Sequence, residues 1–330
     1  MTPFIHPEMA TILAEFRAQP AVDVKTLPID EARRVSDAAS AAWSVGAPAM
    51  DVTELTVPGP FPMRARLYRP AAVEGLPVII FVHGGGWTFG SIDTHDGAMR
   101  ELAVASGCAV FGFDYRLAPE HPFPAPLDDC MAAIAFVHEG GLGRAVAAER
   151  WALAGDSAGA TLALAAMMRL RDAGHSLPAA AALFYGCYAP IFDTPSHHAF
   201  GEGYLLTSVN MRWYWRNYLA DAFDAPPPEA APLEADLAGL PPLYLAAAGL
   251  DPLRDDTSRL AVRLAEAGVD FRYDHVPGVV HGCLRMSRRL PPAQAIITAA
   301  GDMLAGALAT KTTKNQNREE RADDQGDQGT

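Results

Sequence analysis

The sequence predicts an α/β fold in which helices flank a mostly parallel central sheet. Continuous apolar runs, typical of strands covered on both faces, recur at 78–82, 109–113, 151–154, 180–185 and 243–248. Stretches of helical pattern separate these runs, at 97–106, 128–138, 158–171 and 256–267. Strands that alternate with helices favour a parallel sheet with right-handed crossovers.

The residues before this alternation have different patterns. Residues 3–49 are rich in alanine, and apolar residues follow Met9 at the i+3, i+4 and i+7 spacing of a helix. The segments 52–57 and 63–68 alternate between apolar and polar residues on either side of a proline-glycine turn. We expect them to form antiparallel edge strands.

One later stretch interrupts the alternation. Residues 190–240 have no clean strand pattern but contain an aromatic, helix-like run at 211–218, and we expect this insertion to cover the carboxyl ends of the sheet. The final twenty residues contain almost no apolar side chain, which predicts disorder. We therefore divide the chain into an N-terminal helical cap segment (1–50), a core (51–189), a cap insertion and return (190–240), a second core segment (241–310) and a disordered tail (311–330).

The composition is that of a globular chain without a nucleic-acid partner. Of 330 residues, 50% are hydrophobic, and 39 Asp and Glu against 26 Lys and Arg give a formal net charge of −13. An acidic chain lacks the electrostatic attraction on which nucleic-acid binding depends. The opening residues show no signal-peptide pattern, and no apolar run is long enough for a membrane span, so we expect a cytoplasmic protein.

Cysteine and histidine spacings give no sign of a metal site. The four cysteines, Cys108, Cys130, Cys187 and Cys283, lie far apart, which favours buried thiols over zinc ligands or disulfides. His197 and His198 are adjacent on a predicted loop, so their side chains are expected to point apart as a solvated pair.

The motif Gly155-Asp156-Ser157-Ala158-Gly159 matches G-x-S-x-G between a short strand and a helix. That context is the one a nucleophile elbow requires, because a strained turn there presents the serine at a helix N-terminus. We predict that Ser157 is a catalytic nucleophile. It needs a neighbouring base to remove its proton.

The chain order serine, acid, histidine predicts the partners of Ser157. His281 lies in a loop between a strand pattern and the final helix, whereas His275 lies inside the strand pattern, so we favour His281 as the base. Asp251 follows the strand at 243–248 and is the favoured acid, with Asp255 as the alternative. Asp255 and Asp256 could instead cap the next helix.

A glycine-rich loop, His83-Gly84-Gly85-Gly86-Trp87, follows the strand at 78–82. Backbone N–H groups in such a loop can stabilise a developing oxyanion, so we predict donors at Gly84 and Gly85, with a third from Ala158. A phosphate-binding loop is the weaker interpretation, because no Walker lysine or G-x-G-x-x-G accompanies it.

Taken together, these motifs resemble the hormone-sensitive-lipase-like family of α/β hydrolases. The segments 114–125 and 251–255 also match that family's pattern, and the resemblance covers about residues 50–308. It implies an α/β-hydrolase fold with a helical cap, no cofactor, a small-molecule ester substrate of short or medium acyl length, and a homodimer. It also makes Arg116 and Glu120 structural ion-pair partners.

The resemblance leaves the substrate open. The same catalytic groups could cleave an amide or a formamide, and a non-catalytic ligand receptor on this fold is the other alternative. Trp87, Tyr204 and Asp156 are candidate substrate-binding residues, and His95 is expected to cap the helix that begins near Gly97.

Overall fold

An eight-stranded sheet forms the centre of the molecule in the computed structural model, which describes residues 3–20 and 22–323 and the side chains through residue 309 within those ranges. Its strand order is β1-β2-β4-β3-β5-β6-β7-β8. The β1–β2 and β2–β4 pairs are antiparallel and the others are parallel. The strands are β1 (Asp51–Val57), β2 (Met63–Arg69), β3 (Leu76–Val82), β4 (Ala109–Phe113), β5 (Val146–Asp156), β6 (Ala181–Phe184), β7 (Leu243–Leu250) and β8 (Phe271–Val280).

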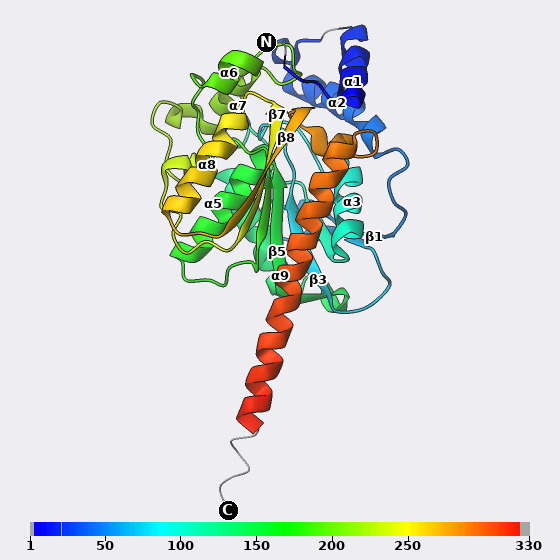
Figure 1. Cartoon of the computed structure of the whole chain (residues 1–330), viewed down its shortest axis with the longest axis vertical. Helices are drawn as coiled ribbons and strands as arrows, with labels where there is room; N and C mark the ends of the chain where they lie inside the picture. The colour runs from blue at the N-terminus through cyan, green and yellow to red at the C-terminus, as the bar shows by residue number, and fades with distance from the viewer. Residues whose placement is uncertain (1–2, 21, 324–330) are drawn as a thin grey trace, which may run out of the picture.

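Helices cover both faces of the sheet (Figure 1). The helices α4, α5 and α8 pack on one face, and α3 and α9 pack on the other. The α-helices are α1 (Pro7–Ala18), α2 (Ile29–Ser40), α3 (Asp96–Ser106), α4 (Ala125–His138), α5 (Ala158–Asp172), α6 (Pro195–Phe200), α7 (Ser208–Leu219), α8 (Arg254–Glu266) and α9 (Pro291–Asp323).

The two apolar cores explain the continuous apolar runs of the sequence. In β3, Val78 and Ile80 belong to one core, whereas Ile79 and Phe81 belong to the other. Successive side chains of a strand point to opposite faces, so a strand covered on both faces needs apolar residues at every position. The predicted parallel α/β architecture is therefore confirmed.

Two strand predictions need correction. The strand β2 is not at an edge, because it lies between β1 and β4 and pairs with β4 through Ala65–Tyr68. The strand β5 begins at Val146 rather than Trp151, and the polar residues Glu149 and Arg150 hid its first half. That half lies near the end of the sheet, where Glu149 stays exposed.

Helices near the N-terminus and in the 190–240 insertion lie together at one end of the molecule (Figure 1). Arg33 of α2 joins this end to the loops that follow β3 and β4: its guanidinium donates to Glu120 at 2.7 Å, to the Thr88 carbonyl at 3.0 Å and to the Ala118 carbonyl at 3.1 Å. The partner of Arg116 is Asp129, at 2.7 Å. Arg116 and Glu120 thus both form ion pairs, each with a different partner.

The disorder of the tail, 311–330, stays a prediction. The backbone of 311–323 continues α9 beyond the sheet (Figure 1), and the rest of the predicted tail, 324–330, lies outside the described residues. Lys, Gln, Arg and Glu are common in 311–323 and favour helix without needing to bury an apolar face.

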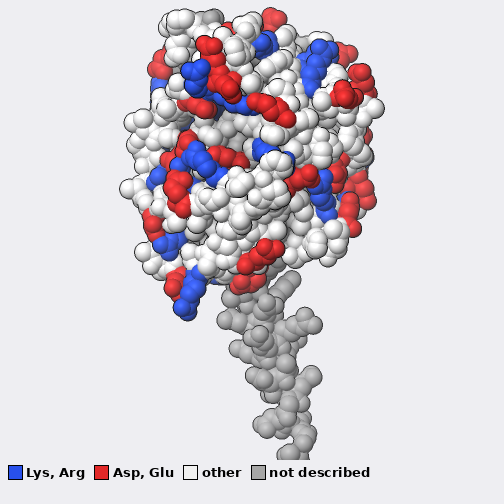
Figure 2. Space-filling view, turned by 180° about the vertical axis from the view of Figure 1, so that it is seen from behind, with Lys and Arg blue, Asp and Glu red and all other residues white. Residues whose placement is uncertain are grey.

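The surface that Figure 2 draws has acidic and basic side chains interspersed, without a continuous basic patch on its described part. Within the described residues, no helix combines the length and the apolar character that crossing a membrane requires.

Candidate active site

Ser157 occupies a sharp turn between β5 and α5. Its φ of 53° and ψ of −122° are strained for a residue with a side chain, at a cost of about 1–3 kcal/mol. A hydrogen bond from the Ser157 N–H to the Phe184 carbonyl, 2.8 Å long, holds the turn. A Cβ atom on Gly159 would lie 2.0 Å from the Val82 carbonyl oxygen, so only glycine lets α5 start this close to β3.

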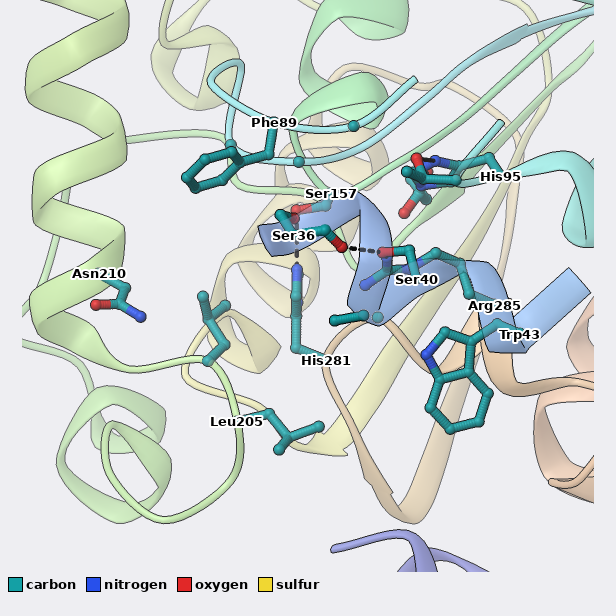
Figure 3. Close-up of a pocket in the computed structure, with 18 of the residues that line it drawn as sticks. Ser36, Ser40, Trp43, Phe89, His95, Ser157, Leu205, Asn210, His281 and Arg285 are labelled. Atoms are coloured by element: carbon teal, nitrogen blue, oxygen red, sulfur yellow. Dashed lines mark hydrogen bonds and ion pairs between the residues drawn. The ribbon is translucent and has the colours of Figure 1, made fainter. Parts of the chain in front are cut away.

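A series of hydrogen bonds joins Ser157 to a buried carboxylate. The Oγ of Ser157 lies 2.8 Å from Nε2 of His281 (Figure 3). The Nδ1 of His281 lies 2.8 Å from Oδ2 of Asp251. The other Asp251 oxygen accepts the Leu253 N–H at 2.9 Å. Asp251 is completely buried, whereas His281 is partly accessible from a cavity.

Strand pairing brings the histidine and the carboxylate together. Leu250 at the end of β7 pairs with Val280 at the end of β8. The next residue of each strand, Asp251 and His281, therefore leaves the sheet beside the other.

The alternative residues have other partners. The Asp255 carboxylate accepts the Ser196 N–H at 2.9 Å and forms an ion pair with Arg254 at 3.2 Å. His275 lies within β8, where burial lowers its pKa. Asp256 does not cap α8, because its carboxylate accepts the Tyr188 N–H at 3.1 Å.

One oxyanion donor predicted in the glycine loop after β3 needs correction. The Gly84 N–H donates to Oδ1 of Asp156 at 2.8 Å, so it is not available to an oxyanion. Gly85 and Gly86 line the cavity instead. Gly85 has a φ of 126°, and a Cβ there would lie 2.1 Å from the Phe89 carbonyl oxygen, so its conformation requires glycine. Ala158 is the first residue of α5, where an N–H has no partner within the helix.

The sequence did not identify His95 as part of this site. His95 precedes α3 without capping it through its side chain, and its Nε2 lies 3.3 Å from Oδ1 of Asp156. Burial alone would raise the pKa of Asp156, but the charge and hydrogen bond of His95 oppose burial, and the net pKa is lowered. Asp156 therefore remains a carboxylate that fixes the Gly84 N–H.

Tyr185 is a second residue that the sequence did not indicate. Its buried hydroxyl accepts the Leu284 N–H at 3.2 Å and lies 3.4 Å from Oδ2 of Asp156. Its ring also packs edge-on against His281, with a centroid distance of 4.9 Å. Tyr185 thus supports the His281 loop and the residue before the serine.

His83, the first residue of the glycine loop, makes contacts that indicate a structural role. Its ring stacks on Tyr115 at 4.3 Å, and its carbonyl accepts the Tyr115 hydroxyl at 2.9 Å. Burial lowers the pKa of His83 to about 3, so the ring stays neutral.

A cavity of about 400 Å³ opens onto Ser157 and His281 (Figure 3). Its wall combines residues of the loops after β3, β5 and β8 with residues of α2, of the 3-10 helix that follows α2, of the loop before α7 and of α7 itself. They include Ser36, Ser40, Trp43, Phe89, Leu205, Asn210 and Tyr214. Asp156 also lies in this wall, and its role in substrate binding stays a prediction.

Trp87 and Tyr204 do not line the described cavity, so their prediction as pocket residues is corrected. Trp87 is fully buried and stacks on Tyr218 at 4.2 Å, because the glycine loop turns its side chain into the apolar core. Tyr204 packs edge-on against Phe200, while its neighbours Leu205 and Leu206 line the cavity.

The remaining candidates form structural contacts. The predicted solvated loop pair is corrected, because His197 and His198 both lie in α6 and His197 is buried. His197 contacts the Ser208 hydroxyl at 2.7 Å, and the exposed His198 pairs with Asp193 at 2.7 Å. All four cysteines are buried. Among the described residues, no group of three or more His, Cys, Asp or Glu side chains is arranged to hold a metal ion.

The fold and the site together define a class of protein. A strand-turn-helix serine, a histidine within hydrogen-bond distance and a buried carboxylate at the carboxyl end of a mostly parallel sheet are the features of α/β hydrolases. The chain belongs to this family: the family model described as alpha/beta hydrolase fold matches residues 79–285. Membership agrees with the resemblance to the hormone-sensitive-lipase-like branch.

Curated relatives and solved structures agree with this membership. The chain is 40% identical over 247 residues to the carboxylic ester hydrolase LipN of Mycobacterium tuberculosis, across 72% of this chain and 65% of LipN. It is 38% identical over 269 residues to the esterase LipI of the same organism, across 74% of this chain and 79% of LipI. A thermostable esterase from Pseudomonas putida superposes with a TM-score of 0.88 at 31% identity, over 93% of this chain and 99% of that one.

Proposed function

We propose that the protein is a serine carboxylesterase that hydrolyses short- to medium-chain acyl esters of small molecules through an acyl-enzyme on Ser157. The observation that carries this proposal is the Ser157–His281–Asp251 hydrogen-bond series, which opens into a cavity of about 400 Å³. Small-molecule sites have volumes of about 300–1,000 Å³. The esterase relatives support the choice of an ester over other acyl compounds.

Acylation begins when Nε2 of His281 takes the proton of the Ser157 hydroxyl. The serine oxygen attacks the ester carbonyl carbon, and Asp251 stabilises the imidazolium through its bond to Nδ1. His281 then gives the proton to the departing alcohol oxygen, which leaves the acyl group on Ser157.

Deacylation repeats the same steps with water. His281 removes a proton from a water molecule, the resulting hydroxide attacks the acyl carbon, and the proton returns to the serine oxygen as the carboxylic acid leaves. Each tetrahedral intermediate carries a negative oxygen. The N–H groups of Gly85, Gly86 and Ala158 are the donors we assign to it, and each such donor contributes about 10²–10³ in rate.

Hydrolysis of p-nitrophenyl esters from acetate to palmitate, beside matched anilides, tests the proposal. The native chain should turn over short and medium esters. The variant Ser157→Ala should lose at least about 10³-fold in kcat and should keep the melting temperature of the native chain. Esterase activity retained by Ser157→Ala would overturn the assignment. Turnover of anilides alone would indicate an amidase or formamidase, and binding without turnover would indicate a receptor.

A cytoplasmic location and a homodimer stay predictions from the sequence. Fractionation of the cells that express the protein and its mass in solution test them.

A further inference from the structure

Arg285 places a cationic side chain in the wall of the cavity. It lies in a short 3-10 helix, η6 (Cys283–Met286), four residues after His281. It is the only lysine or arginine among the described residues that line the cavity. Figure 3 shows it beside Ser40 and Trp43, across the cavity from Asn210.

The charge of Arg285 has no carboxylate partner within ion-pair distance among the described residues. Its Nη1 donates to the neutral Ser40 hydroxyl at 3.0 Å. The next two arginines differ, because Arg288 pairs with Glu101 at 3.3 Å and Arg289 pairs with Glu15 at 2.6 Å. A guanidinium has five N–H donors, so most of those of Arg285 remain available to a ligand.

The Asp156 carboxylate, which also lies in the cavity wall, forms no ion pair with Arg285. Asp156 is 2% exposed, and its oxygens accept the Gly84 N–H and contact His95. Arg285 is half-buried and turned toward the cavity, where the hydroxyls of Ser36 and Ser40 add polar groups from α2. Arg285 is therefore more accessible to an anion in the cavity than Asp156 is, and its charge is one of the influences that lower the pKa of Asp156.

We propose that Arg285 forms an anion subsite and that the cavity prefers esters that carry a free carboxylate away from the bond that is cleaved. This inference rests on the proposed esterase function and narrows its substrate class. Monoesters of dicarboxylic acids carry the carboxylate in the acyl part, and acetylated hydroxy acids carry it in the alcohol part. Either can form the paired hydrogen bonds that a guanidinium makes with a carboxylate.

Matched substrate pairs test the subsite. The acyl pair is mono-4-nitrophenyl adipate and its methyl ester, and the alcohol pair is 3-acetoxybenzoate and its methyl ester. The wild-type chain should have a higher kcat/KM for the carboxylate member of at least one pair, by about 10- to 100-fold, the range expected for hydrogen bonds to a charged group.

The variants separate recognition from structure. Arg285→Gln should abolish the preference, Arg285→Lys should keep part of it, and Arg288→Gln, which removes a paired and exposed arginine nearby, should keep all of it. A preference for the neutral member of both pairs in the wild type, or an unchanged ratio in Arg285→Gln, would overturn the inference. If Arg285→Gln does not fold, the wild-type ratios and Arg285→Lys decide.

Binding distinguishes failure of the subsite from failure of the proposed function. Calorimetry should show that Ser157→Ala binds monomethyl adipate more tightly than dimethyl adipate. Adding Arg285→Gln should remove that difference in affinity. This result would support the subsite even if no ester were turned over. Equal binding of both ligands to Ser157→Ala would count against it even in an active esterase.

Discussion

Ser157 and His281 are 124 residues apart in the chain, yet their side-chain atoms lie 2.8 Å from each other. The third residue of the series decides how well the histidine works. Asp251 holds Nδ1 of His281, which leaves Nε2 facing the serine as the acceptor. A neutral amide at this position would favour the wrong tautomer while leaving the geometry intact.

We therefore expect Asp251→Asn to lower kcat by about 10⁴-fold with little change in KM, because the imidazolium loses its charged partner. Ester turnover over a range of substrate concentrations measures this change. Asp255→Asn is the matched control, since its carboxylate binds the Ser196 N–H and Arg254. A larger loss for Asp255→Asn than for Asp251→Asn would transfer the acid role to Asp255.

At the residue scale, the sequence identified the candidate catalytic residues better than it identified which atoms form hydrogen bonds. The chain order identified Ser157, Asp251 and His281 because each follows a strand of the sheet: apolar runs precede Ser157 and Asp251, whereas the strand before His281 is largely polar in its first half. The Gly84 N–H was assigned incorrectly, since the direction of a loop amide depends on its contact with Asp156. His95 and Tyr185 were missed for the same reason: their roles come from contacts across the fold.

At the scale of elements, α2 forms part of the cavity wall and is joined to the sheet loops by Arg33. This side chain bonds the Glu120 carboxylate and two carbonyl groups, of Thr88 and Ala118. Since Ser36 and Ser40 of α2 line the cavity, the position of this helix sets the shape of the substrate site.

Arg33→Met should loosen α2 and raise KM for an ester by about two- to tenfold, a modest range because the Arg33–Glu120 pair is partly exposed to solvent. Hydrogen exchange should become faster in α2 while remaining unchanged in β3 to β6. Arg34→Met, an exposed residue of the same helix, is the control. Equal exchange in α2 of both variants would contradict the anchoring role of Arg33.

The strand predictions succeeded for strands that are buried on both faces of the sheet. The strands β3, β4, β6 and β7 are apolar at nearly every position because helices cover both faces. The first half of β5 contains Glu149 and Arg150 and so escaped the same criterion. The place of β2 between β1 and β4 depends on pairing between distant segments, which a local pattern does not contain.

At the scale of the whole molecule, one buried carboxylate links stability to pH. Asp256 is fully buried; one of its oxygens accepts the Tyr188 N–H, and the other has no described hydrogen-bond partner. Burial, with added repulsion from Asp251 and Asp255, raises the pKa of Asp256 to about 8. The folded chain thus keeps a proton on this group at neutral pH, whereas the unfolded chain releases it near pH 4.

Because the folded state binds the extra proton, its stability falls as pH rises from about 4 to about 8 and is not lowered further by this group above that. Asp256→Asn removes the ionisation. We expect its melting temperature relative to wild type to increase steadily from pH 5 to pH 8 and then to level off. Asp221→Asn, which deletes an exposed carboxylate, controls for the change in net charge. A difference that stays constant over this range, or that shrinks as pH rises, would show that Asp256 is already ionised in the folded protein.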